Sequence, residues 1–589
     1  MSTTTYKCEV LAEHAEGAID IFANFFVSPL FTRSGTGREV NAVDSENSKN
    51  ITNDSRRRLQ ILKALADPTH HYSKFSTGDA KTLPANGMEK VDLESQECAS
   101  PGHAAGKSKA ALLESKECAS PDRAAGTSKA KNLESNRCTS PGRAAGKSKT
   151  ENLESKGCAS PDRAAGKPKA ELLENKGELV RDALLAFHKR YYRPNNITVA
   201  IVGPQDLDLL QELIVPRFAG IKDQWEQKVE GEMTEAERIV DFASKDAPEV
   251  SFGSPSIHNP AFRPEVQGGQ WPILLTTLPL QSMRKLYLYF PLPPTIHLED
   301  KSPHQLVSHL LGHEGQGSVF AILQDENLAD SLSAGPRLSE RDQSMLQISV
   351  SLTKKGEAQW EKVVKIIFEY CRLLETTINS AQENSDCTGS KDARQELRDI
   401  WTDKSKLASL RFHQTSPGPA FGFAPALASS AMKFGSEKCL SSGSLLDETE
   451  ESLDLNILSD FVGLLTPSNC ILERCSQAAW DEQISNTESH NEFDPIFGLK
   501  TEPWYGVQYY LSKVQPPTVS EWSKSIDFAD RIHLPEQNRY IPRNLELCAD
   551  LPPEAKLGPR IGKKLDPPNL TIEEEYGKVF IFTSLISTL

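Results

Sequence analysis

The sequence has few apolar residues and no long apolar run. Only 38% of its 589 residues are hydrophobic, which is low for a chain that folds throughout and predicts some disorder. No run reaches the roughly 18 apolar residues that suggest a transmembrane helix, so we expect no contact with a membrane. The N-terminal residues MSTTTYKCEVL lack the basic region and apolar core of a secretory signal.

Paired cysteines and an excess of basic residues are also missing. The eleven cysteines are scattered and form no C-x-x-C motif, which argues against a disulfide framework. We therefore expect a reducing compartment and a cytoplasmic protein. The formal net charge is −15, and this acidic balance argues against general binding to nucleic acid or to membrane surfaces.

A low-complexity repeat interrupts the chain. The segment LESQECASPGHAAGKSKA begins at Leu93 and recurs every 20 residues. The equivalent cysteines of the four copies are Cys98, Cys118, Cys138 and Cys158. A 20-residue period can indicate a solenoid, but these copies offer too few apolar residues to stack. Metal binding is disfavoured as well, because no histidine or second cysteine accompanies each cysteine. We predict a disordered, duplicated insert.

Helical and strand patterns flank the insert. They predict helices at Ala15–Phe26, at Arg38 to about Ala66, at Glu178–Tyr192 and at Leu207–Phe218, and a buried strand in ITVAIVG after Pro194. Further along, strands are expected at Lys285–Phe290 and Met345–Leu352, with helices at 304–327, 357–374 and 393–411. Residues 414–450 are rich in Ser, Gly and Ala, and we expect a loose segment without regular secondary structure there. The helix–Pro–Asn–strand order near Tyr191 returns near Asn456, which suggests a duplicated α+β domain.

Two glutamates stand seven residues apart in REVNAVDSENSKN. Glu39 and Glu46 then share one face of a helix, whereas Asp44 lies off that face. One interpretation is a solvated acidic face. The other is a metal-ligating carboxylate with a second acidic residue that orients the site.

Several segments closely resemble the insulin-degrading (insulysin) branch of the pitrilysin metallopeptidases. These are the stretch from Ala15 to Asp79, PNNITVAIVG, SHLLGHEGQGSVF, TEPWYGVQYY and RIHLPEQNRYIPRN. The resemblance implies two similar α/β-roll domains of the mitochondrial-processing-peptidase type. It also implies Zn²⁺ as cofactor, unfolded peptides as substrates, Glu46 as a zinc ligand and Glu39 as the acidic residue behind it.

The motif that defines the family's metal site is missing. No H-x-x-E-H occurs in the sequence, and a catalytic zinc needs three protein ligands and an open position for water. Because one carboxylate cannot supply this set, we expect no catalytic residues here and no peptide hydrolysis by these residues alone. The resemblance further implies a first domain truncated at its N-terminus and a C-terminal half that is mostly missing.

The stretch HLLGHEGQGS places His309 and His313 one helical turn apart, followed by Glu314 and Gly315. This glutamate follows the second histidine, which is not the register of either known zinc-helix motif. By resemblance, the stretch and a following strand would anchor the N-terminus of a peptide. The residues of this predicted exosite are His309, His313, Glu314, Gly315, Ser333, Ala334 and Gly335. Plain packing and an adventitious metal pair remain as alternatives.

These observations support three functional hypotheses. The first is an insulysin-like zinc metalloendopeptidase seen as an incomplete chain, through a gene-model error or because a partner chain supplies the rest. The second is a non-catalytic homologue that binds peptides or assists an active, zinc-bearing subunit. The third gives the repeats a tethering role. The expected domains are a first peptidase-type domain (1–83 and 178–228), the insert (84–177), a linker (229–270), a second non-catalytic domain (271–515), and a linker with the start of a third domain (516–589).

Overall fold

The structure of the protein is a computed structural model. It describes residues 2–80, 82–83, 169–223, 260–264, 271–298, 302–340, 342–382, 393–414, 418–447, 449, 452–487, 497–524, 529–542 and 578–587. Residues 89–169 are grouped apart from the remainder of the chain, and nearly all of them, with the four full repeats, lie outside the described residues.

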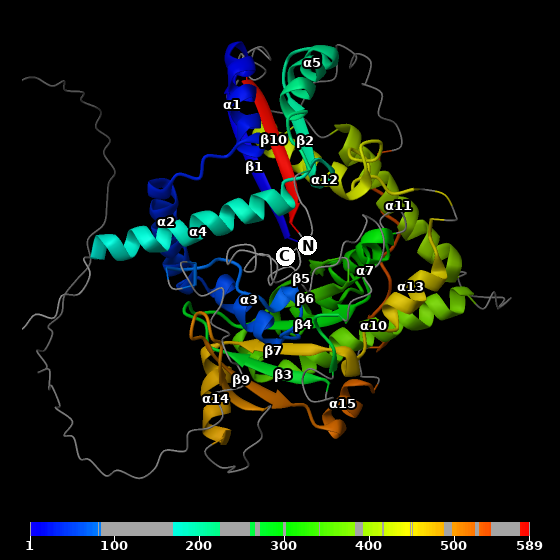
Figure 1. Cartoon of the computed structure of the whole chain (residues 1–589). Helices are drawn as coiled ribbons and strands as arrows, with labels where there is room; N and C mark the ends of the chain where they lie inside the picture. The colour runs from blue at the N-terminus through cyan, green and yellow to red at the C-terminus, as the bar shows by residue number, and fades with distance from the viewer. Residues whose placement is uncertain are drawn as a thin grey trace, which may run out of the picture. The chain divides into compact units, whose positions relative to one another are not determined.

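The described strands form two sheets (Figure 1). The first has the order β1-β10-β2, with β1 (Ser2–Leu11), β10 (Lys578–Ser587) and β2 (Ile197–Val202). The second has the order β5-β6-β4-β7-β3-β9-β8. Its strands are β3 (Ile273–Thr277), β4 (Lys285–Leu292), β5 (Ala329–Ser339), β6 (Ser344–Leu352), β7 (Ile471–Cys475), β8 (Gly498–Thr501) and β9 (Gln508–Lys513). The mixed α+β fold expected from the sequence is confirmed.

The principal helices of the first region are α1 (Ala15–Val27), α2 (Arg33–Ile51), α3 (Asp54–Leu65), α4 (Lys169–Tyr191) and α5 (Leu207–Phe218). Those of the second region are α7 (Pro303–Leu311), α8 (Val319–Asp325), α9 (Lys354–Ala358), α10 (Trp360–Gln382), α11 (Ala393–Gln414), α12 (Ala420–Phe434), α13 (Leu455–Val462), α14 (Gln477–Thr487) and α15 (Pro516–Trp522). None of the helices in the described part of the chain is both long and apolar enough to cross a membrane.

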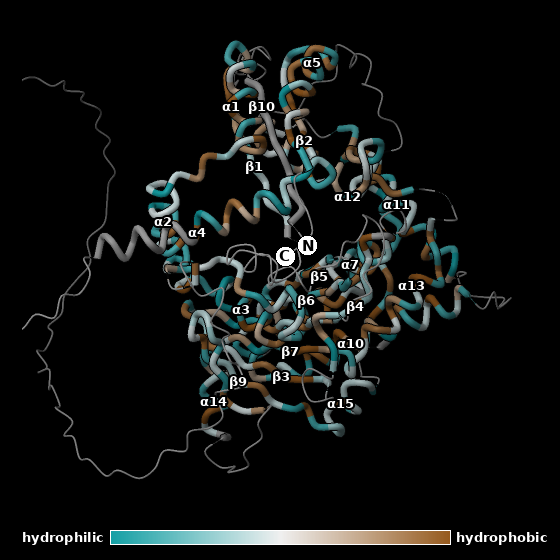
Figure 2. The backbone as a smooth tube through the Cα atoms, viewed as in Figure 1, coloured by the Kyte–Doolittle hydropathy of each residue, from teal (hydrophilic) through white to brown (hydrophobic). Residues whose placement is uncertain are grey.

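Each sheet has its own apolar core. One face of the seven-stranded sheet packs with α7, α8, α10, α11 and α13 around residues such as Leu288 and Phe368, both at most 1% exposed. The other face packs with α3 through Ile61 and Leu65. The three-stranded sheet packs with α1 and α4 through Ile19 and Phe26. Figure 2 shows the apolar residues running along the central strands of the larger sheet and along α10.

Three details differ from the sequence-based expectations. The long helix expected from Arg38 to Ala66 is two helices, because the chain turns at Thr52 and the Asn53 side chain caps α3 by accepting from Arg56 N–H. Residues 414–450, expected to be loose, contain α12. The apolar ending after Lys578, assigned to the start of a third domain, is paired on both edges as β10.

Residues after 515 also join the second core. Trp522 of α15 is fully buried among residues of α10, and Ile532 and Leu534 belong to the same cluster. The Trp522 ring lies 6.5 Å from that of Phe368 and 6.0 Å from that of Trp360, centroid to centroid. The segment expected to begin a linker at 516 therefore packs onto the second region up to Leu534.

Candidate peptide-anchoring site

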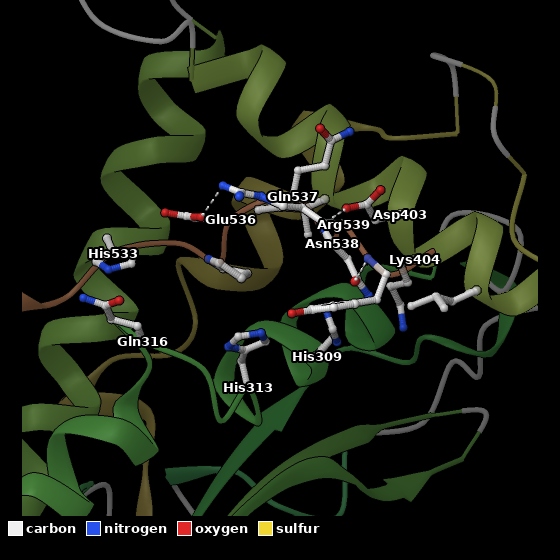
Figure 3. A pocket seen from close by; sticks show the side chains of 14 residues that line it. His309, His313, Gln316, Asp403, Lys404, His533, Glu536, Gln537, Asn538 and Arg539 are labelled. Atoms are coloured by element: carbon white, nitrogen blue, oxygen red, sulfur yellow. Dashed lines mark hydrogen bonds and ion pairs between the residues drawn. The ribbon is translucent and has the colours of Figure 1, made fainter. Parts of the chain in front are cut away.

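The HLLGHEGQGS stretch lies at the end of α7, beside a cavity (Figure 3). His309 sits on the last turn of the helix, and Gly312 ends it, so that His313 falls in the following turn. The two rings are 5.9 Å apart, nearly perpendicular to each other. The cavity measures about 550 Å³, and besides these histidines it is lined by Gln316, Ile400, Asp403, Lys404, Leu407, His533, Pro535, Glu536, Gln537, Asn538, Arg539 and Tyr540.

Two segments far apart in sequence close this cavity. The N–H of Asn538 donates to a carboxylate oxygen of Asp403 on α11 at 2.7 Å, and the N–H of His533 donates to the carbonyl oxygen of Gly317. Gly317 has a φ of +79°, and a Cβ at that position would lie 2.5 Å from the His533 ring. Glycine is therefore required there both by backbone conformation and by contact.

Burial lowers the pKa values of two histidines in the cavity. That of His309 falls to about 4, and electrostatic interactions with Lys404, His313 and Arg411 act in the same direction. Burial also lowers the pKa of His313, against a raising effect of Glu314. The Gly315 N–H donates to His313 Nδ1 at 3.0 Å, so the neutral ring carries its hydrogen on Nε2.

The same turn borders the edge of the larger sheet. Among the described strands β5 pairs only with β6, so one of its edges is open. A Cβ at Gly312 would lie 3.5 Å from the Ala334 nitrogen, which shows how closely the end of α7 approaches this strand. Ser333 and Glu314 are exposed, and Gly335 has open space where a side chain would begin. The predicted exosite residues are therefore gathered on one turn and one edge strand.

The predicted metal residues lie elsewhere, on α2. Glu39 and Glu46 are both exposed on the same face of the helix, as the seven-residue spacing predicts, whereas Asp44 accepts a hydrogen bond from Ala80 N–H. By resemblance Glu39 is the acidic residue behind Glu46; in this structure both side chains are exposed. Among the described residues, no group of three metal-ligating side chains includes Glu46.

One group of three metal-ligating side chains was not predicted from the sequence. His70, His71 and Asp342 have ligand atoms within 4.8 Å of one another. Asp342 Oδ2 is hydrogen-bonded to His70 Nε2, and Tyr72 N–H donates to His70 Nδ1 at 3.0 Å. Because Nδ1 accepts, the neutral His70 ring carries its hydrogen on Nε2 and donates it to Asp342. The lone pair that a metal would need at Nε2 is therefore absent, and we interpret the group as a hydrogen-bonded latch.

The adjacent histidines of THHYSKF were the visible signal for this latch, but their acidic partner is 272 residues from His70. Burial tends to raise the pKa of Asp342, but the hydrogen bond from His70 and electrostatic interactions with the two histidines outweigh it and hold the pKa below the ordinary value. No local pattern indicates such a partner.

Comparison with known proteins identifies the family. Three family descriptions match successive parts of the chain: "Insulinase (Peptidase family M16)" at residues 1–69, "Peptidase M16 inactive domain" at 178–382 and "Middle or third domain of peptidase M16" at 411–581. The chain belongs to peptidase family M16. Individual M16 relatives agree with this, and the resemblance to the insulysin branch is confirmed.

The M16 chain is 24% identical over 545 residues to "Insulin-degrading enzyme-like 1, peroxisomal" of Arabidopsis thaliana, which covers 92% of this chain and 40% of the relative. It is also 24% identical over 570 residues to "Insulin-degrading enzyme" of Drosophila melanogaster, covering 97% of this chain and 42% of that protein. The chain thus spans about two fifths of the length of these relatives. Its fold is similar to the crystal structure of pitrilysin, with a TM-score of 0.57 and 18% identity, over 92% of this chain and 42% of pitrilysin.

The described residues do not fit the ligand set of the catalytic zinc that the M16 family implies. Glu46 is a single exposed carboxylate, the sequence holds no H-x-x-E-H, and the His70 group is oriented as a hydrogen-bonded latch. His309 and His313 point to a cavity but gather no third ligand within the described part of the chain. These residues do not provide the three ligands of a catalytic zinc, and no hydrolytic step is derived from them.

Proposed function

We propose that this M16 chain serves an insulysin-like zinc metalloendopeptidase by anchoring unfolded peptides at β5 and the end of α7. The open edge of β5, which the end of α7 approaches at Gly312, is the observation that carries the proposal. An extended peptide adds to such an edge through main-chain hydrogen bonds. The Glu314 carboxylate then offers an ionic partner for the peptide's α-amine.

The proposal separates binding from hydrolysis. The one three-ligand group among the described residues, at His70, is interpreted as a hydrogen-bonded latch. Binding is therefore expected from the purified chain and cleavage is not. Hydrolysis would need a further polypeptide segment or a partner subunit that bears two histidines and a general base. The same edge would serve a non-catalytic homologue that hands peptides to an active subunit, and co-purification with an H-x-x-E-H protein would favour that role.

Peptide binding can be tested by fluorescence anisotropy with a labelled, unfolded peptide. Gly335→Val should weaken binding, since its side chain would occupy open space beside β5 that the side chains of a docked peptide would share, while the core stays intact. Glu314→Gln and N-terminal acetylation of the peptide should each weaken binding by about two- to fivefold, the effect expected for an exposed ion pair. Combined, they should add little, because they remove the same interaction. Gly37→Ala, in open space on α2, is the matched control.

Equal binding by the wild type and by Gly335→Val would overturn the anchoring site. Zinc is tested separately, by its stoichiometry in the purified chain, which we expect to be well below one. A tightly held equimolar zinc that Glu46→Gln abolishes would contradict the ligand count. Zinc lost only in Asp342→Asn would instead place it at the His70 latch.

A further inference from the structure

The two sheets share a three-stranded arrangement. In the larger sheet β4 lies between β6 and β7 and runs antiparallel to both. In the smaller sheet β10 lies between β1 and β2 and runs antiparallel to both. Figure 1 shows β10, in red, between the blue β1 and the cyan-green β2.

The outer strands of the two arrangements also correspond in chain order. Strand β6 leads into α9 and α10, and β1 leads into α1. Strand β7 follows a single helical turn at Pro467–Asn469, and β2 follows one at Pro194–Asn196. The middle positions of the sheets are thus equivalent. In the larger sheet the middle strand, β4, precedes both of its neighbours in the sequence. In the smaller sheet the middle strand, β10, follows both of its neighbours and begins at residue 578.

We propose that the slot between β1 and β2 is a strand-acceptor site for an extended apolar segment, and that Lys578–Ser587 is its resident ligand. This site is separate from the β5 edge and does not depend on the proposed function. The segment pairs at ten positions with β1 and at six with β2, which satisfies the facing backbone groups of both strands. An empty slot would leave two open inner edges.

The two faces of the acceptor are already formed by other elements. Tyr6, Cys8 and Val10 of β1 face the core with α1 and α4. On the opposite face α12 packs against all three strands, and Lys7 Nζ lies 3.8 Å from the centroid of the Phe421 ring. The pocket for a strand is thus defined on both faces and both edges, which favours a segment free of proline and rich in apolar residues. KVFIFTSLIS has no proline or glycine and one charge.

A cross-strand disulfide tests the register. Ile581 is directly opposite Cys8 on β1, and opposed side chains in an antiparallel pair lie close enough for a disulfide. Ile581→Cys should therefore cross-link to Cys8 within one chain under mild oxidation, as read by peptide mapping. Phe582→Cys is the matched control, because residue 582 is opposite Lys7 and is one position out of register with Cys8. Equal cross-linking of both variants, or none, would overturn the assignment, and a cross-link between two chains would show that the segment comes from a second copy.

Binding in trans tests the ligand. A chain lacking residues 578–589 should bind a labelled KVFIFTSLIS peptide carrying solubilising lysines, whereas the full chain should bind at least tenfold more weakly, because a tethered ligand competes at an effective concentration of about millimolar. The same peptide with proline in place of Phe582 should not bind, since proline removes a ladder hydrogen bond. Gly335→Val should leave this binding unchanged, which separates the slot from the β5 edge. If the shortened chain does not fold, the Ile581→Cys cross-link remains the test of the proposal. A shortened chain that folds but does not bind the peptide overturns the proposal.

Discussion

At the scale of single residues, the described structure is held by a few buried polar contacts between segments far apart in the sequence. Arg58 of α3 donates to both carboxylate oxygens of Glu473 on β7, at 2.8 and 3.0 Å, and its guanidinium lies over the Tyr287 ring. The Glu473 side chain is only 1% exposed. Burial tends to raise its pKa, but the charge and hydrogen bonds of Arg58 outweigh this and lower it.

Removing one partner of this pair leaves a buried charge. Arg58→Ala should lower the free energy of unfolding by about 3–5 kcal/mol, the usual cost of an uncompensated buried ion. Arg58→Met combined with Glu473→Leu should restore much of the loss. Arg539→Ala is the control, because its pair with Glu536 is 86% and 77% exposed, and it should change stability by less than about 0.5 kcal/mol. Urea denaturation followed by circular dichroism measures all three, and an equal loss in both single variants would contradict the argument.

The partly buried His309 at the cavity predicts a pH dependence. Burial, followed by the charge of Lys404, lowers the pKa of His309 to about 4, whereas an unfolded histidine titrates near 6.5. Between these values the unfolded state binds more protons, so the free energy of unfolding should fall as the pH drops from about 6.5 to 4. His309→Gln should make this slope shallower, and His14→Gln, at a site with a 70% exposed side chain, should not. Denaturation at a series of pH values would show identical slopes if the idea is wrong.

At the scale of elements, close approach of the backbone decides which glycines are required. A Cβ on Gly356, in the short helix α9, would lie 1.8 Å from the carbonyl oxygen of Leu328, just before β5. Gly37, in the second turn of α2, has no atom outside the neighbouring helix backbone within 4 Å of the same position. The residue type is identical, but its role differs with the packing of the helix.

These two glycines should respond to alanine in opposite directions. Gly356→Ala should destabilise the protein by about 3 kcal/mol or more, because α9 must move away from the turn that leads into β5. Gly37→Ala should stabilise by about 0.5–1 kcal/mol through lower backbone entropy in the unfolded chain. Thermal unfolding of the two variants beside the wild type provides the measurement, and shifts of the same sign would refute this assignment.

At the scale of the whole molecule, the two regions cover each other's sheets. Helix α3, which follows α2 in the first region, packs on the seven-stranded sheet, whereas α12, which follows α11 in the second, packs on the three-stranded sheet. This reciprocal packing joins residues 2–80 to the second region through apolar contacts and the Arg58–Glu473 pair. The duplicated order of elements seen in the sequence is thus a duplicated arrangement in space.

The repeat insert should contribute nothing to this packing. Its copies lack the apolar residues to form a core, so replacing residues 93–168 with a Gly/Ser linker should leave the unfolding midpoint and peptide binding unchanged. Calorimetry and the anisotropy assay give the comparison. A shortened chain that folds but loses peptide binding would assign a functional role to the repeats.

Local pattern was sufficient for most single elements. The apolar periodicity of AEGAIDIFANFF predicts α1, and the alternation of MLQISVSL predicts β6, because burial on one face imposes the period of the element. The HLLGHEGQGS turn was also predicted as an anchoring site by resemblance, and the structure sets it beside the open edge of β5. The break at Thr52 and the helix at 420–434 were missed, since a cap and a packing surface decide them.

By itself the sequence determined most of the element types, the duplicated order, the family and the absence of the zinc motif. Only the tertiary structure decided which distant segments meet: Arg58 with Glu473, His70 with Asp342, and Lys578–Ser587 with both β1 and β2. The reason is physical. Helix and strand periods arise from neighbours in the chain, whereas a strand's partner or a buried charge's counterion is selected by packing across hundreds of residues, which no local pattern records.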